Sequence, residues 1–104
     1  MLIIRGVNLY PSQVEAILME SEGTEPHYQI VVDREDAMDE LEIKVEVTPE
    51  IFSDEVKQLN RLSNDIRERI KYMLGISATV TLVEPHSIER SVGKAKRVID
   101  RRKQ

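Results

Sequence analysis

The fold of this chain is decided by residues 40–48, which read ELEIKVEVT. The apolar positions recur at every second residue and are Leu41, Ile43, Val45 and Val47. In an extended chain such residues share one face, while the charged residues between them share the other. We therefore predict an antiparallel strand with one buried and one solvated face. The carboxylates on its polar face are interpreted as surface charges, and these are Glu40, Glu42 and Glu46.

A second strand is predicted just upstream. Within residues 27–33, Tyr28, Ile30 and Val32 share one face, and Val31 makes the other face partly apolar. The polar residues 34–39 that separate the two strands are few, which favours a hairpin connection. The strands should therefore pair directly.

A short helix is predicted from Pro11, because a proline at the first helical position has no N–H to leave unbonded. Val14, Ile17 and Leu18 then fall on one helical face at a spacing of three and four residues. This helix should end before Gly23.

A longer helix is predicted to begin within residues 49–53, with Ser53 or Asp54 as its cap. Gly75 stands where a glycine commonly follows a helix C-terminus. One stripe of the helix is apolar and consists of Val56, Leu59, Leu62, Ile66, Ile70 and Met73.

The ends of the chain supply the remaining elements. Residues 2–4 and 7–9 are apolar on either side of Arg5-Gly6, and glycine tolerates the backbone of a tight bend, so we predict a small hairpin or bent strand. Residues 77–83 alternate like a strand, and residues 95–102 are predicted to form a short basic helix.

The element order is strand, helix, strand, strand, helix, strand. This order predicts an α+β fold of the ferredoxin-like, split βαβ type, with two helices on one face of a four-stranded antiparallel sheet. A short N-terminal hairpin and a basic C-terminal loop and helix would complete it. Residues 1–104 are expected to form a single domain, because that length suits one small core.

Composition excludes several classes of protein. The chain is 40% hydrophobic and 33% charged, which is typical of a folded domain rather than a disordered one. It contains no cysteine, so disulfide frameworks and thiolate chemistry drop out, and its two histidines, His27 and His86, suggest neither a metal site nor a catalytic triad. No apolar run approaches the ~20 residues that cross a bilayer. We therefore expect a cytoplasmic protein with no membrane partner.

The net charge of −4 is unevenly distributed. Residues 1–89 contain 8 basic and 18 acidic residues, whereas residues 90–104 contain 7 basic residues and one acidic residue. Such a tail can be a solvated end or can bind a phosphate-bearing small molecule. Nucleic-acid binding is disfavoured by the acidic body and by an aromatic content of only 4%.

The tail contains one pair of residues that suits a role in catalysis, Gly93-Lys94. It does not complete a phosphate-binding loop, because Ile88 occupies the position where that motif needs its first glycine. A lysine that follows a glycine on a loop can still neutralise an anion that develops on another domain. The plainer interpretation is a solvated loop lysine.

Three blocks of sequence carry a family resemblance. They are residues 1–15, MLIIRGVNLYPSQVE, residues 26–29, PHYQ, and residues 90–100, RSVGKAKRVID. Together they resemble the C-terminal domain of phenylacetate-coenzyme A ligases, a branch of the adenylate-forming acyl-CoA synthetase superfamily. The resemblance covers essentially the whole chain.

The resemblance implies a reaction in two steps, in which ATP converts a carboxylic acid to an acyl-adenylate and the sulfur of coenzyme A (CoA) then displaces AMP. It implies that Lys94, supported by Gly93, is the catalytic lysine of adenylation. It also implies that Arg5, Gly6 and Val7 lie in the loop that enters the active site for the thioester step. ATP, Mg²⁺ and CoA would serve the intact enzyme, and this domain alone would bind no cofactor.

Two departures from the family pattern matter. The acidic hinge residue that usually precedes the MLIIRG stretch is missing, and Glu89 stands where relatives carry a proline. We therefore expect a domain without its N-terminal adenylate-binding partner, inactive alone. Two alternatives stay open: a free-standing ferredoxin-like module that binds an anionic ligand, and a domain of a related ligase that adenylates a different acid.

Overall fold

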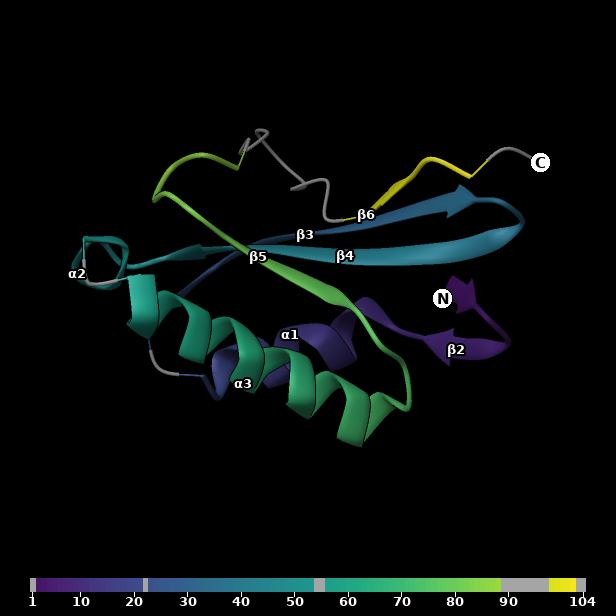
Figure 1. Cartoon of the computed structure of the whole chain (residues 1–104), viewed down its shortest axis with the longest axis horizontal. Helices are drawn as coiled ribbons and strands as arrows, with labels where there is room; N and C mark the ends of the chain where they lie inside the picture. The colour runs from purple at the N-terminus through teal and green to yellow at the C-terminus, as the bar shows by residue number, and fades with distance from the viewer. Residues whose placement is uncertain (1, 22, 54–55, 89–97, 103–104) are drawn as a thin grey trace.

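A mixed sheet forms the centre of the fold. The computed structural model describes residues 2–21, 23–53, 56–88 and 98–102, and within these ranges a four-stranded sheet has the order β5-β4-β3-β6. The long inner strands are β3 (Thr24–Glu35) and β4 (Met38–Val47), and the edges are β5 (Thr79–Val83) and β6 (Val98–Asp100). Figure 1 shows the long β3–β4 ribbon that sets the length of the molecule.

The β3–β4 hairpin confirms the predicted direct pairing. The two strands are antiparallel, and Glu35 pairs with Met38 at the tip. The two residues between them, Asp36 and Ala37, have φ of 52° and 65°. Two successive positive φ angles match the twist of paired strands. The connection is therefore only two residues long, and both strands continue through most of the segment predicted to link them.

The two outer strand pairs are parallel, which corrects the predicted all-antiparallel sheet. β5 runs parallel to β4, and β6 runs parallel to β3. The chain travels from β4 to β5 through the helix α3 (Val56–Leu74), and a crossover of this kind brings the next strand back in the same direction. The α+β class with helices on one face of a four-stranded sheet is confirmed, whereas the ferredoxin-like topology is wrong.

A second correction concerns the two ends of the chain. The N-terminal strands β1 (Leu2–Ile4) and β2 (Val7–Leu9) form the predicted hairpin, but this hairpin is a separate two-stranded sheet. Its expected place in the main sheet is taken by β6, within the segment predicted to be a basic helix. Val98 and Ile99 are β-branched, which favours the strand, and they pair with Ile30 and Val31.

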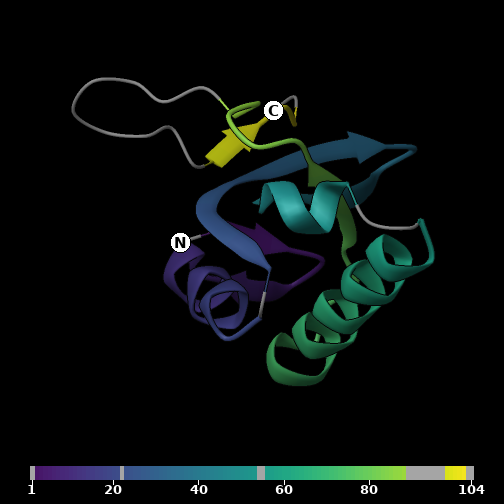
Figure 2. The same cartoon turned by 90° about the vertical axis from the view of Figure 1, so that its left-hand side faces the viewer.

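The helices cover one face of the sheet. Figures 1 and 2 place α1 (Pro11–Met19) and α3 on the same side, and the β1–β2 hairpin lies on that side too. The buried residues of α1 are the three predicted ones, Val14, Ile17 and Leu18. They join a core with Ile4 and Leu9 of the hairpin, so the hairpin is packed in place by apolar contacts.

The predicted long helix is divided in two. Residues Pro49–Phe52 form a short helix, α2, capped by the Thr48 side chain, whose hydroxyl accepts from the Ile51 N–H at 3.3 Å. In α3 the apolar stripe is buried only in its middle, at Ile66 and Ile70, while both its ends are exposed. Within the described ranges, none of the helices combines the length and the apolar character needed to cross a bilayer.

Candidate functional site

The β1–β2 turn consists of Arg5 and Gly6, two of the residues implicated by the resemblance. Their φ angles are 50° and 79°, the pair of positive values that a two-residue hairpin turn of this kind requires. Glycine adopts this backbone freely, whereas a residue with a Cβ is strained in it. A Cβ built on Gly6 would meet no atom within 4 Å. The turn therefore presents open backbone at Gly6.

Asp39, a residue of the main sheet, accepts hydrogen bonds from both the backbone and the side chain of Arg5. The Arg5 backbone N–H donates to Asp39 Oδ2 at 3.4 Å, and Arg5 Nε donates to the Asp39 carbonyl oxygen at 2.8 Å. Asp39 is the second residue of β4, at the tip of the long hairpin. The turn is thus tied to the end of the sheet.

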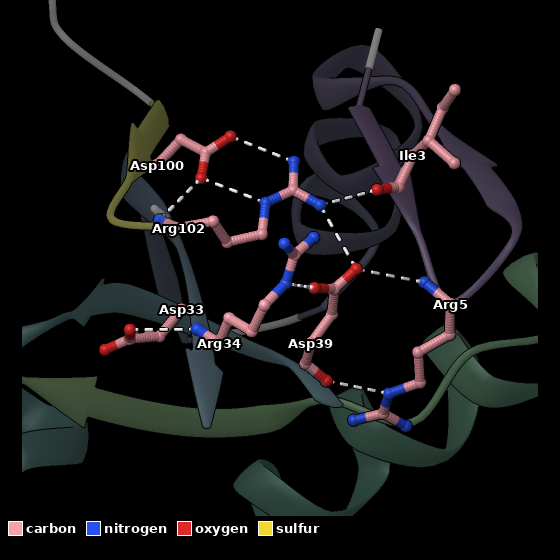
Figure 3. Close-up of polar contacts among 7 residues, drawn as sticks. All are labelled: Ile3, Arg5, Asp33, Arg34, Asp39, Asp100 and Arg102. Carbon is pink, nitrogen blue, oxygen red and sulfur yellow. Dashed lines mark hydrogen bonds and ion pairs between the residues drawn. The ribbon is translucent and has the colours of Figure 1, made fainter. Parts of the chain in front are cut away.

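The Asp39 carboxylate lies among further arginines, as Figure 3 shows. Arg34 Nε donates to Oδ1 at 2.9 Å, and Arg102 Nη1 donates to Oδ2 at 3.1 Å. The Asp39 side chain is 12% exposed. The hydrogen bond from Arg34 is the main cause that lowers the pKa of this carboxyl below its ordinary 3.8. The carboxylate is therefore charged throughout the physiological range.

Arg102 joins three parts of the molecule. Its Nη1 also donates to the carbonyl oxygen of Ile3 in β1 at 2.7 Å. Its Nε and Nη2 donate to the two carboxylate oxygens of Asp100 at 3.0 and 2.9 Å, so that pair is bidentate. The Asp100 hydrogen bond raises the pKa of Arg102, and the same contact lowers the pKa of Asp100. Arg102 thus connects the β1–β2 hairpin, the tip of β4 and the end of β6.

Two clefts meet at Arg5. One, of about 410 Å³, is lined by the arginine–aspartate cluster and by Gly6. The other, of about 440 Å³, lies between the turn and the C-terminal half of α3 and includes Arg67 and Lys71 in its lining. The turn thus lies between two clefts whose linings contain both cationic and acidic side chains.

Glu46 is wholly buried, which overturns its interpretation as a surface charge. It accepts hydrogen bonds from the backbone N–H of His86 at 2.8 Å and of Ile88 at 3.0 Å. The alternation places Glu46 on the polar face of β4, but alternation cannot reveal that a later loop covers that face. Residues 84–88 do so, and Glu46 fixes the loop from which the chain continues toward Lys94.

The structure accounts for part of the predicted site. Arg5 and Gly6 form the turn, and Val7 begins β2 and packs partly buried against the core. Lys94 and Gly93 lie outside the described residues. Within the part of the chain that is described, no three histidine or acidic side chains gather as a metal-binding group. Asp39 and Arg102 were not identified from sequence, since no local motif marks contacts 34 and 63 residues apart.

The comparisons with known proteins identify the class of domain. The family described as AMP-binding enzyme C-terminal domain matches residues 6–102, and the chain belongs to that family. It corresponds to the C-terminal domain of phenylacetate-coenzyme A ligases. It is 47% identical to the ligase of Thermus thermophilus over 99% of the chain and 45% identical to that of Escherichia coli over 98%. Since those alignments cover 26% and 23% of the two enzymes, the chain spans about a quarter of the length of the curated relatives it matches.

Solved structures agree with the same assignment. A domain of phenylacetate-coenzyme A ligase from Bacteroides vulgatus superimposes with a TM-score of 0.90 at 30% identity, over 99% of this chain and 93% of that one. A 2-hydroxyisobutyryl-CoA ligase, solved with its acyl-adenylate and CoA in the thioester-forming state, gives 0.89 at 40% identity over 98% of this chain and 21% of its own. The resemblance read from the three sequence blocks is therefore confirmed.

Proposed function

We propose that the chain acts as the mobile C-terminal domain of an aryl-acetate CoA ligase that activates phenylacetate. The observation that carries this proposal is the identity of 45–47% to phenylacetate-coenzyme A ligases over nearly the whole chain. The partner would be an N-terminal domain that binds ATP and the acid. Because ATP and CoA are cytoplasmic metabolites, the reaction belongs in the cytoplasm.

The first step would form the acyl-adenylate. A carboxylate oxygen of the acid attacks the α-phosphorus of ATP, and the bond to the departing diphosphate breaks. Negative charge shifts at the α-phosphate during this attack, so an ammonium held there stabilises the transition state more than the separated substrates. We assign that ammonium to Lys94.

The second step would form the thioester. The sulfur of CoA attacks the acyl carbon, and AMP leaves with the electron pair of the broken C–O bond. We assign Arg5, Gly6 and Val7 to the passage for the pantetheine arm of CoA. Support comes from the turn itself, because Gly6 leaves its backbone uncovered and a thin ligand arm can approach such backbone closely.

The two steps would use different surfaces of the domain, one that carries Lys94 and one that carries the Arg5-Gly6 turn. A rotation of the domain between the steps would offer each in turn. In support, the 2-hydroxyisobutyryl-CoA ligase has been solved in a postadenylation state as well as in the thioester-forming state, and this chain matches its chain in both.

The identity of the activated acid is a separate part of the proposal, because the acid pocket would belong to the N-terminal domain. A related ligase for a different acid stays the second candidate, and the 40% identity to a 2-hydroxyisobutyryl-CoA ligase favours it specifically. The test is AMP release by the intact ligase with ATP, CoA and either phenylacetate or 2-hydroxyisobutyrate. Phenylacetate should be used at least tenfold more efficiently. A preference for the hydroxy acid would contradict the aryl-acetate assignment.

The isolated chain provides the matching control. It should release no AMP with any acid, because its described residues contain no nucleotide pocket with an acid/base pair. Turnover near 1 per second, within the ordinary range for enzymes, would contradict the proposed division of labour between two domains.

A further inference from the structure

We propose that Asp39 is a positioning residue for the thioester step, which it serves by fixing the orientation of the Arg5-Gly6 turn. The proposal rests on the proposed function of that turn. It concerns a residue on a different strand, 34 positions away from Arg5, that would itself touch neither CoA nor the acyl-adenylate.

Asp39 accepts hydrogen bonds from both the backbone and the side chain of Arg5. Its carboxylate accepts from the Arg5 backbone N–H, which fixes the path of the turn, and its carbonyl oxygen accepts from Arg5 Nε, which fixes the guanidinium. Figure 3 shows the Arg5 side chain extending from the turn toward the Asp39 carbonyl oxygen, where it makes the second bond. The turn and its cation are thus oriented by one residue.

The carboxylate is itself held in place from two sides. Arg34 on β3 and Arg102 after β6 donate to its two oxygens, and both partners are bonded at 3.1 Å or less. Arg102 adds a second tie to the hairpin through the Ile3 carbonyl. Because charge-assisted bonds of this length are short and directional, the carboxylate has little freedom to follow a moving turn.

The apolar packing of the hairpin is independent of this cluster. Ile4 and Leu9 are fully buried in the main core, and they secure the base of the hairpin. Removing the Asp39 side chain should therefore leave the hairpin folded, with Arg5 Nε still bonded to the backbone carbonyl of residue 39, while the Arg5 N–H loses the carboxylate that fixes the path of the turn. A misplacement of about 1 Å at a reacting or binding group can cost on the order of 100-fold in rate. The loss should fall on the step that uses the turn.

The test compares Asp39→Ala with Asp33→Ala in the intact ligase, and measures the two half-reactions separately. Asp33 is the matched control, since it is an exposed aspartate on the paired strand whose carboxylate accepts from the adjacent Arg34 N–H. Purified acyl-adenylate and CoA report the second step, and diphosphate exchange into ATP reports the first. Gly6→Val calibrates the role of the turn itself.

For Asp39→Ala we expect kcat/KM for CoA to fall about 10- to 100-fold, with diphosphate exchange within about twofold of the parent. Asp33→Ala should match the parent in both steps. Asp39→Asn, which keeps one acceptor oxygen, should show a smaller loss in the same direction. This variant keeps the test valid if Asp39→Ala proves too unstable to assay.

Three results would overturn the proposal. If Gly6→Val blocks the CoA step and the Asp39 variants do not, the turn has its proposed function but Asp39 does not orient it. If no variant affects the CoA step, the proposed function of the turn is wrong and the inference falls with it. If the Asp39 variants lose both half-reactions equally, Asp39 serves only the stability of the domain.

Discussion

Asp39 and Glu46 lie on the same strand, yet their carboxylates meet different surroundings. Asp39 receives arginine side chains at the tip of β4, whereas Glu46 is buried under a loop and accepts two backbone N–H groups. Both positions look solvated in the sequence, because alternation separates polar from apolar faces but does not show which distant segment returns to cover a face. The residues missed by the sequence analysis are those whose partners lie far along the chain.

The lowered pKa of Asp39 predicts a pH dependence of stability. The pKa is depressed in the folded state, so the carboxylate stabilises the fold above its unfolded value near 3.8, and this contribution is lost as pH falls through the lower folded value. Asp39→Asn should therefore lower the Tm of the chain at pH 6. The difference in Tm from the parent should shrink steadily below pH 4. A difference that stayed constant down to pH 2 would mean that the charge of Asp39 contributes nothing to folding.

Replacing Glu46 should lower the stability of the fold by a large amount. Glu46→Ala would leave the N–H groups of His86 and Ile88 without their carboxylate acceptor, and a buried donor left unsatisfied costs about 1–3 kcal/mol. We expect the free energy of unfolding to fall by about 3 kcal/mol or more. Urea denaturation of the chain measures it. Glu40→Ala is the control, because Glu40 is exposed on the same strand and should change stability by less than about 0.5 kcal/mol.

At the scale of elements, the segments with a strong local period were predictable. The buried face of α1, the alternating strand β4, the hairpin around Arg5-Gly6 and the glycine after α3 all follow from local spacing. The strand β6 did not, because only three residues pair and its neighbours in sequence are basic. The direction of the outer strands was also missed, since it depends on which strands become neighbours in the sheet.

Valine substitutions at Gly6 and Gly75 distinguish the effect of backbone strain from the effect of an obstructed passage for CoA. Gly6 and Gly75 have φ of 79° and 72°, and at neither would a Cβ meet another atom within 4 Å. Gly6→Val and Gly75→Val should therefore cost similar stability, on the order of 1–3 kcal/mol. In the intact ligase, only Gly6→Val should make acyl-adenylate accumulate while transfer to CoA slows.

The measurement is a rapid-quench time course of acyl-adenylate and thioester for both valine variants. Gly75→Val should transfer the acyl group at the parental rate once its lower stability is allowed for by working at a temperature where it stays folded. Equal slowing of transfer in both variants would show that backbone strain, rather than an obstructed passage, is responsible.

At the scale of the whole molecule, the sequence resemblance identified the family of the domain, whereas the hydrophobic periodicity predicted only its fold class. Periodicity alone predicted the α+β class but placed the chain in the wrong topology. The three sequence blocks identified the family, which the match over residues 6–102 confirms. Composition could not supply the function, because the chemistry would be divided between this domain and a partner domain.

We propose that this domain supplies the positive charge of adenylation through Lys94. The competing cations are those of the rest of the basic tail, of which Lys96 is the nearest matched control. Removing a preorganised donor at a transition state typically costs about 100- to 1,000-fold in rate, whereas removing an exposed charge contributes little.

The decisive measurement is therefore diphosphate exchange and acyl transfer by the intact ligase carrying Lys94→Ala or Lys96→Ala. We expect Lys94→Ala to lose about 100- to 1,000-fold in adenylation and still to transfer the acyl group from supplied acyl-adenylate to CoA. Lys96→Ala should remain near the parent in both steps. If the two variants adenylate equally well, Lys94 does not carry the charge of adenylation.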